Sequence, residues 1–420
     1  MGIDYTDRQT GGVSQAMNEK GSNHLILKQN NYQLIKKHIY RHSPISRVEI
    51  AQQLGLTTAT ITGMVNPMIS SGLLRETATP STETKGAGRP RMMLEYVPQS
   101  FYVCGVDVGV YQTNYILTDI CGNTVFFRHT DEPLGEYHIT LERLSQQIPE
   151  FLAQSGIPKD KLLGVGVCLP GMIDGSADKI YDIFHEGWTE HSLSAELGQR
   201  LGLKVEVENN VRARAISASL FDRMVKAEPF AYFFVSFGIA CQMIIDGKVL
   251  YGQSAAAGEI GHTVVQRNGP VCPSCGNRGC LEALTGERAI LQQCRDIMAT
   301  PEFTILHELC PDPRNLTMDH VLQAQEMGDL AVNRLIEDAI EYLGIALANT
   351  INLISPRAVV LEGRILSTPQ NQARMLRTVE QYMFHIHSGI TDFTFLLYDP
   401  SRGARAAAAV VVKEFLSNTI

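Results

Sequence analysis

Long apolar segments are absent from this sequence. No run approaches the ~20 apolar residues that a membrane-spanning helix needs, and the first residues, MGIDYTDRQTGG, contain no apolar signal segment. These absences argue against a membrane or secreted protein and predict a cytoplasmic one. The hydrophobic fraction of 44% and the charged fraction of 19% are typical of a globular protein, and 420 residues suffice for two or three domains.

The sequence also lacks the features of a disulfide-bonded secreted protein. Nine cysteines without a signal segment indicate a reducing compartment rather than a disulfide framework. Four of them lie in apolar, strand-like runs and are expected to be small buried side chains: Cys104, Cys121, Cys168 and Cys241.

Three other cysteines lie in the segment 258–282, which reads GEIGH, nine residues, then CPSCGNRGCLE. One imidazole and three thiols fall within nineteen positions there: His262, Cys272, Cys275 and Cys280. Thiolates with one histidine, separated by turn residues, are the ligands of a closed tetrahedral zinc site. We therefore expect a structural zinc ion, with a reduced, metal-free cluster as the alternative.

Positive charge is scarce overall but concentrated near the N-terminus. The net charge is −8, yet residues 24–91 contain nine Lys and Arg against three acids, a balance of +6 that leaves −14 for the rest. A basic head on an acidic body favours a nucleic-acid-binding module joined to a separate effector domain.

The basic region has the pattern of a helix-turn-helix. An amphipathic helix is expected over 31–41. Ser46-Arg-Val-Glu49 is a capping-box pattern, which predicts a second helix to residue 54 that ends at Gly55. Thr57 is placed to cap a third helix, continuing to about residue 71. Such a third helix would enter a major groove of double-stranded DNA.

The candidate DNA-binding residues lie on that third helix and on a loop after it. Small or hydrogen-bonding side chains form its predicted outer face, although an ordinary solvated face is the alternative. A Thr/Ser/Gly-rich loop then ends in KGAGRPR between two strand-like segments, like the wing of a winged helix, with an arginine suited to a minor groove. The predicted DNA-binding residues are Thr57, Thr58, Thr62, Asn66, Arg89 and Arg91.

From Phe101 onward, strand-like runs alternate with helix-like segments. This alternation, after three leading strands, predicts a two-lobed α/β body with a cleft between the lobes. The expected strands are 101–110, 113–120, 124–129, 164–169, 204–208, 232–237 and 241–245, and the expected helices are 138–154, 281–298, 331–353 and 404–416.

The order of motifs resembles the ROK family, which groups sugar kinases with sugar-responsive repressors. The motifs are D-x-G at 107–109, LPGMID at 169–174, ENN at 208–210, AGEIGH at 257–262 and C-x2-C-G-x2-G-C-L-E at 272–282. The N-terminal winged helix resembles the repressor branch, of the xylose and N-acetylglucosamine repressor type.

The resemblance implies a winged helix-turn-helix followed by a ribonuclease-H-like body of two lobes. The expected division is a disordered lead-in over 1–23, a DNA-binding domain over 24–97, a first lobe over 98–212 plus about 400–420, and a second lobe with the zinc site over 213–399.

The resemblance also implies that kinase chemistry is lost. Phosphates need glycine-rich turns, and here Val110 and Tyr111 replace Gly and Thr in the first turn, the second keeps one glycine, and Glu362 enters the third. The kinases take the sugar's proton with the aspartate of E-N-D, where this chain has Asn210, and an amide cannot accept that proton.

The sugar-facing positions of the family are better preserved. Carboxylates and amides pair with vicinal hydroxyls, although Glu259 and Glu282 could instead cap helices, and His262 could serve the metal, the sugar or the core. By resemblance the sugar-binding residues are Gly171, Asn209, Asn210, Glu259, His262 and Glu282.

The sequence therefore predicts a non-enzymatic regulator, a repressor that binds a DNA operator as a homodimer or homotetramer, takes a sugar or sugar phosphate as effector and has no membrane partner. Two alternatives stay open: a sugar kinase with an added DNA-binding head, and a repressor controlled by a protein partner.

Overall fold

The chain forms two compact units in a computed structural model that describes residues 19–78, 91–174, 178–182, 187–222, 229–252, 255–300 and 304–418. The first, here the N-terminal unit, comprises Met1–Ser100 and Glu414–Ile420. The second, here the body, comprises Phe101–Lys413. Among the described residues no helix is long and apolar enough to cross a membrane.

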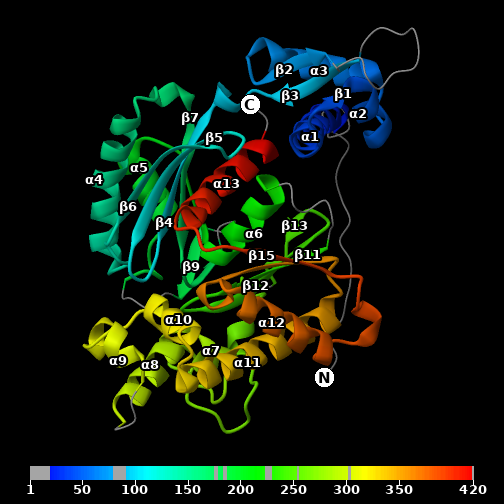
Figure 1. Ribbon diagram of the computed structural model, residues 1–420. Coiled ribbons are helices and arrows are strands. Elements are labelled where there is room, and N and C mark those ends of the chain that lie inside the picture. The colour runs from blue at the N-terminus through cyan, green and yellow to red at the C-terminus, as the bar shows by residue number, and fades with distance from the viewer. Residues whose placement is uncertain are drawn as a thin grey trace, which may run out of the picture. The chain divides into compact units, whose positions relative to one another are not determined.

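The N-terminal unit is a small α/β domain (Figure 1). Its elements, in chain order, are α1 (Glu19–His42), β1 (Ile45–Ser46), α2 (Arg47–Leu54), α3 (Thr58–Ser70), β2 (Leu74–Ala78) and β3 (Met92–Tyr96). The strands form an antiparallel sheet in the order β1-β3-β2. The two strands predicted on either side of the wing loop are confirmed as β2 and β3.

Both helices of the helix-turn-helix begin and end where their capping residues predict. The Ser46 side chain accepts from the Glu49 N–H and the Glu49 side chain accepts from the Ser46 N–H, which completes the capping box. Gly55 ends α2 in the left-handed conformation, at φ 64°, which a residue with a Cβ adopts at a cost. Thr57 caps α3 by accepting from the N–H of Thr60.

The described interior of this unit is largely apolar but contains one buried lysine. Ile61, Val65 and Met68 of α3 are buried, as the helical pattern predicts, and they share the core with α1 and β3. Lys36 of α1 is fully buried, and its ammonium donates to the backbone oxygen of Asn418 over 3.0 Å. It also lies 3.7 Å from the centre of the Phe415 ring. The cation therefore satisfies a carbonyl at the C-terminal end of α13 (Ser401–Ser417).

The body contains two five-stranded sheets of the same topology. The first has the order β10-β7-β4-β5-β6 and the second β13-β12-β11-β14-β15. In each, three strands form an antiparallel meander and two later strands join in parallel. The strands are β4 (Tyr102–Val108), β5 (Thr113–Asp119), β6 (Thr124–Thr130), β7 (Leu162–Leu169), β10 (Val205–Asn209), β11 (Phe230–Val235), β12 (Ile239–Ile245), β13 (Lys248–Val249), β14 (Ala358–Gly363) and β15 (Asp392–Leu396), with a separate hairpin of β8 (Met172–Asp174) and β9 (Lys179–Asp182).

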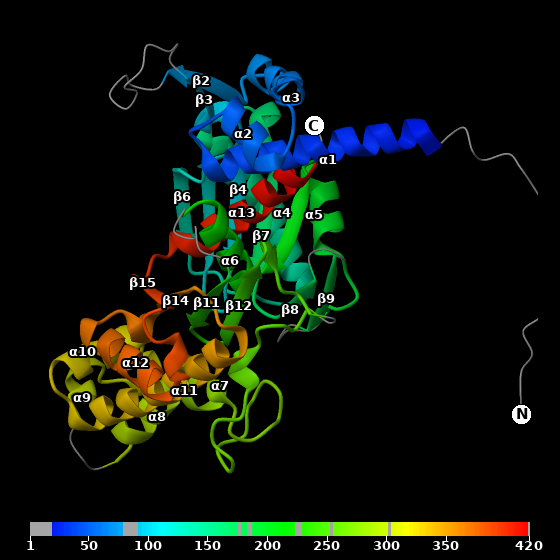
Figure 2. The same ribbon diagram turned by 90° about the vertical axis from the view of Figure 1, so that its right-hand side faces the viewer.

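Helices cover both faces of each sheet. On the first sheet, α4 (Tyr137–Ser155) and α5 (Leu193–Leu201) cover one face and α13 the other (Figure 1). Gly105 and Gly166 permit this approach, since a Cβ on either would overlap the α13 backbone. On the second sheet, α6 (Asn210–Leu220) packs against one face. The large cluster of α7 (Leu281–Thr285), α8 (Glu287–Met298), α9 (Leu306–Leu309), α10 (Met318–Glu326), α11 (Leu330–Ile354) and α12 (Pro369–Tyr382) lies on the other (Figure 2).

The predicted two-lobed α/β architecture is confirmed, with differences in single elements. The first helix begins at Glu19, well before residue 31. The helix expected over 281–298 is broken between α7 and α8 at Gly286, whose ψ of 152° is extended. Helices α5, α6 and α12 and strands β14 and β15 were not predicted, because their short apolar runs resemble loops when read without their neighbours.

Candidate functional site

The predicted DNA-binding residues lie at the start and along one side of α3. Thr57, Thr58 and Asn66 are exposed and Thr62 is half-buried, opposite the buried face of the helix. Their spacing of four residues places Thr58, Thr62 and Asn66 on one stripe. Thr57 also caps the helix, so its side chain has a structural role beside any contact with DNA.

The arginines around α3 have partners inside the unit. Arg91 is exposed and lies 3.9 Å from Glu49. Arg89 lies outside the described residues. Arg47, which sequence reasoning missed, donates to the Asn66 side chain over 3.3 Å and pairs with Glu76. Its position directly after the Ser46 cap could have identified it as a neighbour of α3.

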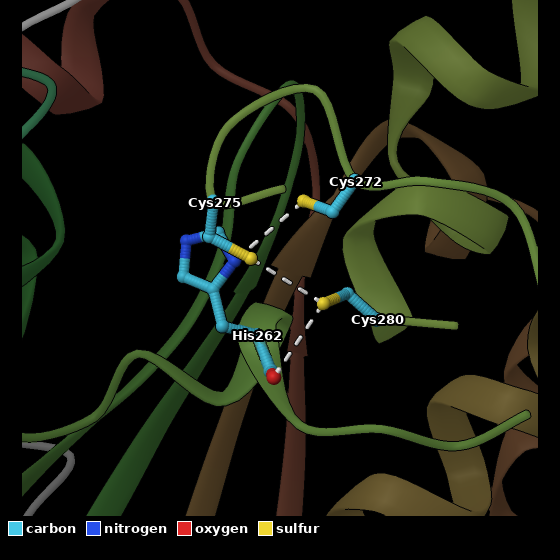
Figure 3. A group of neighbouring side chains, drawn as sticks. All are labelled: His262, Cys272, Cys275 and Cys280. Carbon is cyan, nitrogen blue, oxygen red and sulfur yellow. Dashed lines mark hydrogen bonds between the residues drawn. The ribbon is translucent and has the colours of Figure 1, made fainter. Parts of the chain in front are cut away.

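The four predicted metal ligands converge on one point. Their ligand atoms all lie within 4.8 Å of one another. Cys272 Sγ is 3.8 Å from His262 Nδ1, and Cys275 Sγ is 3.6 Å from Cys280 Sγ. Ligands about 2.3 Å from a tetrahedral zinc ion would lie roughly 3.8 Å apart. Figure 3 shows the three sulfur atoms and the imidazole facing a common centre. The cluster could therefore hold a metal ion.

The thiols of this cluster differ in their environment. Cys275 is exposed, and hydrogen bonding from the backbone of Asn277 lowers the pKa of its thiol. Burial raises the pKa of the Cys280 thiol to about 12. Because thiolates bind metals, a metal ion in the cluster would have to displace the Cys280 proton, which would pass to solvent.

The carboxylates beside the cluster are tied to it. Glu282 lies in the first turn of α7, directly after Cys280, and its Oε1 accepts from the hydroxyl of Ser274 over 2.7 Å. Ser274 stands between two of the cysteines, so the metal cluster orients Glu282 from both sides. Glu259 is half-buried, and burial raises the pKa of its carboxyl, although the nearby His262 and Arg212 act in the opposite direction. Glu259, His262 and Glu282 are thus brought together.

A second group of predicted sugar-binding residues gathers where β10 ends. Asn209 caps α6, its side-chain oxygen accepting from the N–H groups of Val211 and Arg212. Its amide nitrogen donates to the backbone oxygen of Gly171 over 2.8 Å. Asn210 is half-buried at the first position of α6. Arg212 joins the two groups, because it is bonded to Asn209 and is close enough to Glu259 to lower that carboxyl's pKa.

Arg212 and Tyr251 are further residues of this region that sequence reasoning missed. The Arg212 guanidinium is fully buried and pairs with Glu208 over 2.9 Å. It donates to two backbone carbonyls, that of Ala255, over 2.7 Å, and that of Ile173 in β8. The Tyr251 hydroxyl donates to the other oxygen of Glu208 over 2.8 Å. The i, i+4 spacing of Glu208 and Arg212 was the available signal.

Two cavities lie elsewhere in the body. The larger, of about 440 Å³, is lined by residues of α8 and α11 with Gln266, and the smaller, of about 210 Å³, by residues of α4 and its neighbours. Neither is lined by a predicted sugar-binding residue, so the candidate site rests on its convergent polar side chains.

A buried charge cluster links β4 and β14 to α6 and α13. Arg214 of α6 lies 3.4 Å from both Asp107 and Glu362. The Glu362 carboxylate also meets Arg402 of α13 over 3.4 Å and accepts from the Tyr232 hydroxyl. Burial lowers the pKa of Arg214, but Asp107 and Glu362 together raise it above its usual value.

The comparisons with known proteins agree with this architecture. The model of the ROK family matches residues 103–414. The xylose repressor of Bacillus subtilis is 29% identical over 397 residues, which are 93% of this chain and 97% of that protein.

Solved structures share the fold. A ROK family transcriptional regulator, described as a homologue of the Escherichia coli MLC protein, superposes with a TM-score of 0.79 at 23% identity, covering 93% of this chain and 97% of its own. The glucokinase of Streptomyces griseus, solved with glucose and AMPPNP, superposes with a TM-score of 0.63 at 21% identity, covering 74% of this chain and 98% of its own.

Proposed function

This chain belongs to the ROK family, and we propose that it acts there as a sugar-responsive transcriptional repressor. One observation carries the proposal: a xylose repressor is matched over nearly its whole length by nearly the whole of this chain. The glucokinase is matched over nearly its whole length by 74% of it. The extra length is therefore what this chain shares with regulators, and it includes a helix-turn-helix.

DNA is the proposed partner of the N-terminal unit. Thr58, Thr62 and Asn66 form a stripe of small, hydrogen-bonding side chains suited to base edges, and Thr57 holds the start of α3 for a major groove. Arg89 and Arg91 of the wing would contact the phosphates or the minor groove. A homodimer or homotetramer would place two such units on half-sites about 34 Å apart, or a multiple of it.

A sugar or sugar phosphate is the proposed effector of the body. Glu259 and Glu282 supply acceptors for vicinal hydroxyls, and His262 lies beside them. Asn209 holds Gly171 against the start of α6 and keeps one amide hydrogen for a ligand, while Asn210 can bond a hydroxyl without activating it. Polar groups that pair with the hydroxyls of one sugar would reject analogues that lack them, which would make such a site selective.

Zinc is the proposed metal of the Cys3His cluster. Three thiolates and an imidazole at these separations fit a four-coordinate ion, and a fourth protein ligand leaves no open position for substrate. The ion would supply a fixed geometry rather than chemistry. Because Cys280 directly precedes α7, its position would fix the first turn of that helix, which carries Glu282.

Phosphoryl transfer is not part of the proposed function. The body has the fold of a kinase, but Glu362 at the end of β14, paired with Arg214 and Arg402, stands where the resemblance implies a glycine-rich phosphate turn. A phosphate there would have to displace a buried, paired carboxylate, at a cost of several kcal/mol. Asn210 also offers no base for the sugar hydroxyl.

The test uses the purified full-length protein. Genomic fragments retained by the protein are selected and sequenced, and one is then titrated by fluorescence anisotropy with and without xylose, glucose, N-acetylglucosamine and their phosphates. We expect nanomolar, salt-dependent binding that one of these ligands weakens.

Three results would contradict the proposal in different ways. Rapid ADP release with a hexose would identify a kinase with an added head. Specific DNA binding that only a protein from a cell extract relieves would favour control by a protein partner. Absence of any specific fragment would remove the DNA-binding function.

A further inference from the structure

The Tyr251 hydroxyl connects Glu208 to helix α13. Lys413 of α13 donates to the Tyr251 oxygen over 3.2 Å, and the Tyr251 O–H donates in turn to Glu208 over 2.8 Å. Burial, followed by Glu208, raises the pKa of Tyr251, which keeps its proton on the oxygen. The two hydrogen bonds therefore run in one direction, from the lysine through the hydroxyl to the carboxylate.

The Glu208 end of this connection is held firmly. Its carboxylate accepts from the N–H of Asn209 over 2.8 Å and from Arg212 Nε over 2.9 Å, and both charged side chains are almost fully buried. Arg212 extends the same network to the carbonyls of Ile173 and Ala255. The backbone at Ile173, near Gly171, and at Ala255, before Glu259, is thus bonded to the Glu208–Arg212 ion pair.

Ala255, four residues before Glu259, has a strained backbone conformation. Ala255 has φ 53°, in the left-handed region that a non-glycine residue occupies at a cost of roughly 1–2 kcal/mol. Its carbonyl is retained by Arg212 over 2.7 Å. The Arg212 guanidinium therefore helps to hold a strained backbone conformation next to the candidate site.

Helix α13 is shared by the two units of the chain. Lys413 is the last residue of the body, and the residues from Glu414 onward belong to the N-terminal unit. There, Phe415 and Asn418 contact the buried Lys36 of α1. Lys413 and Phe415 lie within one turn of a continuous helix, so a shift or rotation imposed at Lys413 is passed to Phe415 through backbone hydrogen bonds.

We propose that the Tyr251–Lys413 contact is the positioning link through which sugar bound at Glu259 weakens DNA binding. The inference rests on the proposed function. Sugar bound at Glu259 shifts the nearby Arg212 and its partner Glu208, the Tyr251 hydroxyl then changes its hydrogen bond with Lys413, and α13 transmits the change to Lys36. Tyr251 and Lys413 touch neither sugar nor DNA in this scheme; they determine how strongly the two ligands are coupled.

The experiment measures that coupling in the full-length protein. The DNA dissociation constant is measured with and without saturating effector, and their ratio is the coupling factor, typically 5–150-fold in allosteric proteins. In Tyr251→Phe and Lys413→Met we expect this ratio to fall at least about five-fold or to approach one. Sugar affinity, DNA affinity without sugar and thermal stability should stay close to wild type. If the contact had only a structural role, its loss would lower thermal stability or one of the two affinities instead.

Matched variants isolate the contact. Lys413→Arg keeps a donor and should restore most of the coupling. Tyr382→Phe removes a hydroxyl from an exposed tyrosine, and Lys204→Met removes a surface lysine that pairs with Glu206; both should keep the wild-type ratio. If Tyr251→Phe and Lys413→Met fold, bind both ligands and keep the full ratio, the inference is wrong. If the wild-type protein itself releases no DNA with any sugar, both the proposed function and this inference are wrong.

Discussion

The buried charge cluster of the body yields a prediction about stability. In Arg214→Met, Asp107 and Glu362 lose their shared cation, and all three of these residues are no more than 9% exposed. Removing one partner of a buried ion pair leaves uncompensated charge and typically costs 3–5 kcal/mol. Glu362 keeps Arg402 and Tyr232, so most of that cost should come from Asp107. We therefore expect the body to lose about 3 kcal/mol of unfolding free energy.

Trp188 provides the assay. It is the one tryptophan of the sequence and is buried in the core of the first sheet, so its fluorescence during urea unfolding reports on the body alone. Neutralising the carboxylates should compensate: Arg214→Met combined with Asp107→Asn and Glu362→Gln should recover much of the loss, since buried ion pairs are often replaceable by neutral groups.

Arg314→Met is the matched control. It removes an arginine from the exposed ion pair with Asp312, where no measurable change in stability is expected. A change in Arg214→Met as small as that in Arg314→Met would refute the argument, as would a triple variant less stable than the single one.

Three further predictions concern the N-terminal unit and the metal cluster. Burial lowers the pKa of Lys36 to about 8, so its charged form destabilises the folded state fully below pH 8 and less as the pH rises toward the unfolded value near 10.5. Stability followed by circular dichroism should therefore gain about 1–3 kcal/mol between pH 7.5 and 10 relative to Lys36→Met. Parallel pH profiles of the two proteins would contradict this. Purified protein should contain one zinc ion per chain by elemental analysis, and Cys275→Ser, which removes an exposed ligand, should lose it and melt at a lower temperature; full zinc content in this variant would remove Cys275 from the site. Asn66→Ala should weaken specific DNA binding by about 1–3 kcal/mol with little effect on non-specific DNA, whereas an equal loss on both would place Asn66 at the phosphates.

Local chemistry made much of the fold predictable. Capping residues such as Ser46 and Thr57 act through hydrogen bonds within four residues, so the helix-turn-helix could be recognised without knowing what surrounds it. The metal cluster was predictable for a similar reason, because its ligands lie in turns that keep them close along the chain.

Elements whose apolar faces are short could not be predicted in the same way. Helix α6 and strand β14 become regular only when packed against neighbours far away in sequence, since neither has a long periodic pattern of its own. The break at Gly286 has a tertiary cause as well: a Cβ there would press against the backbone oxygen atoms of Glu282 and Phe237.

The sequence by itself determined which groups are available: three thiols and an imidazole in one segment, an amide at position 210 and a carboxylate at position 362. Only the tertiary structure decided what these groups contact. Asp107, Arg214, Glu362 and Arg402 come from four elements spread over nearly three hundred residues, and Tyr251 meets Lys413 across more than 160 positions. Such pairs form because sheets and helices pack into a shared core, and no pattern within one segment encodes which distant side chain the packing will bring to its side.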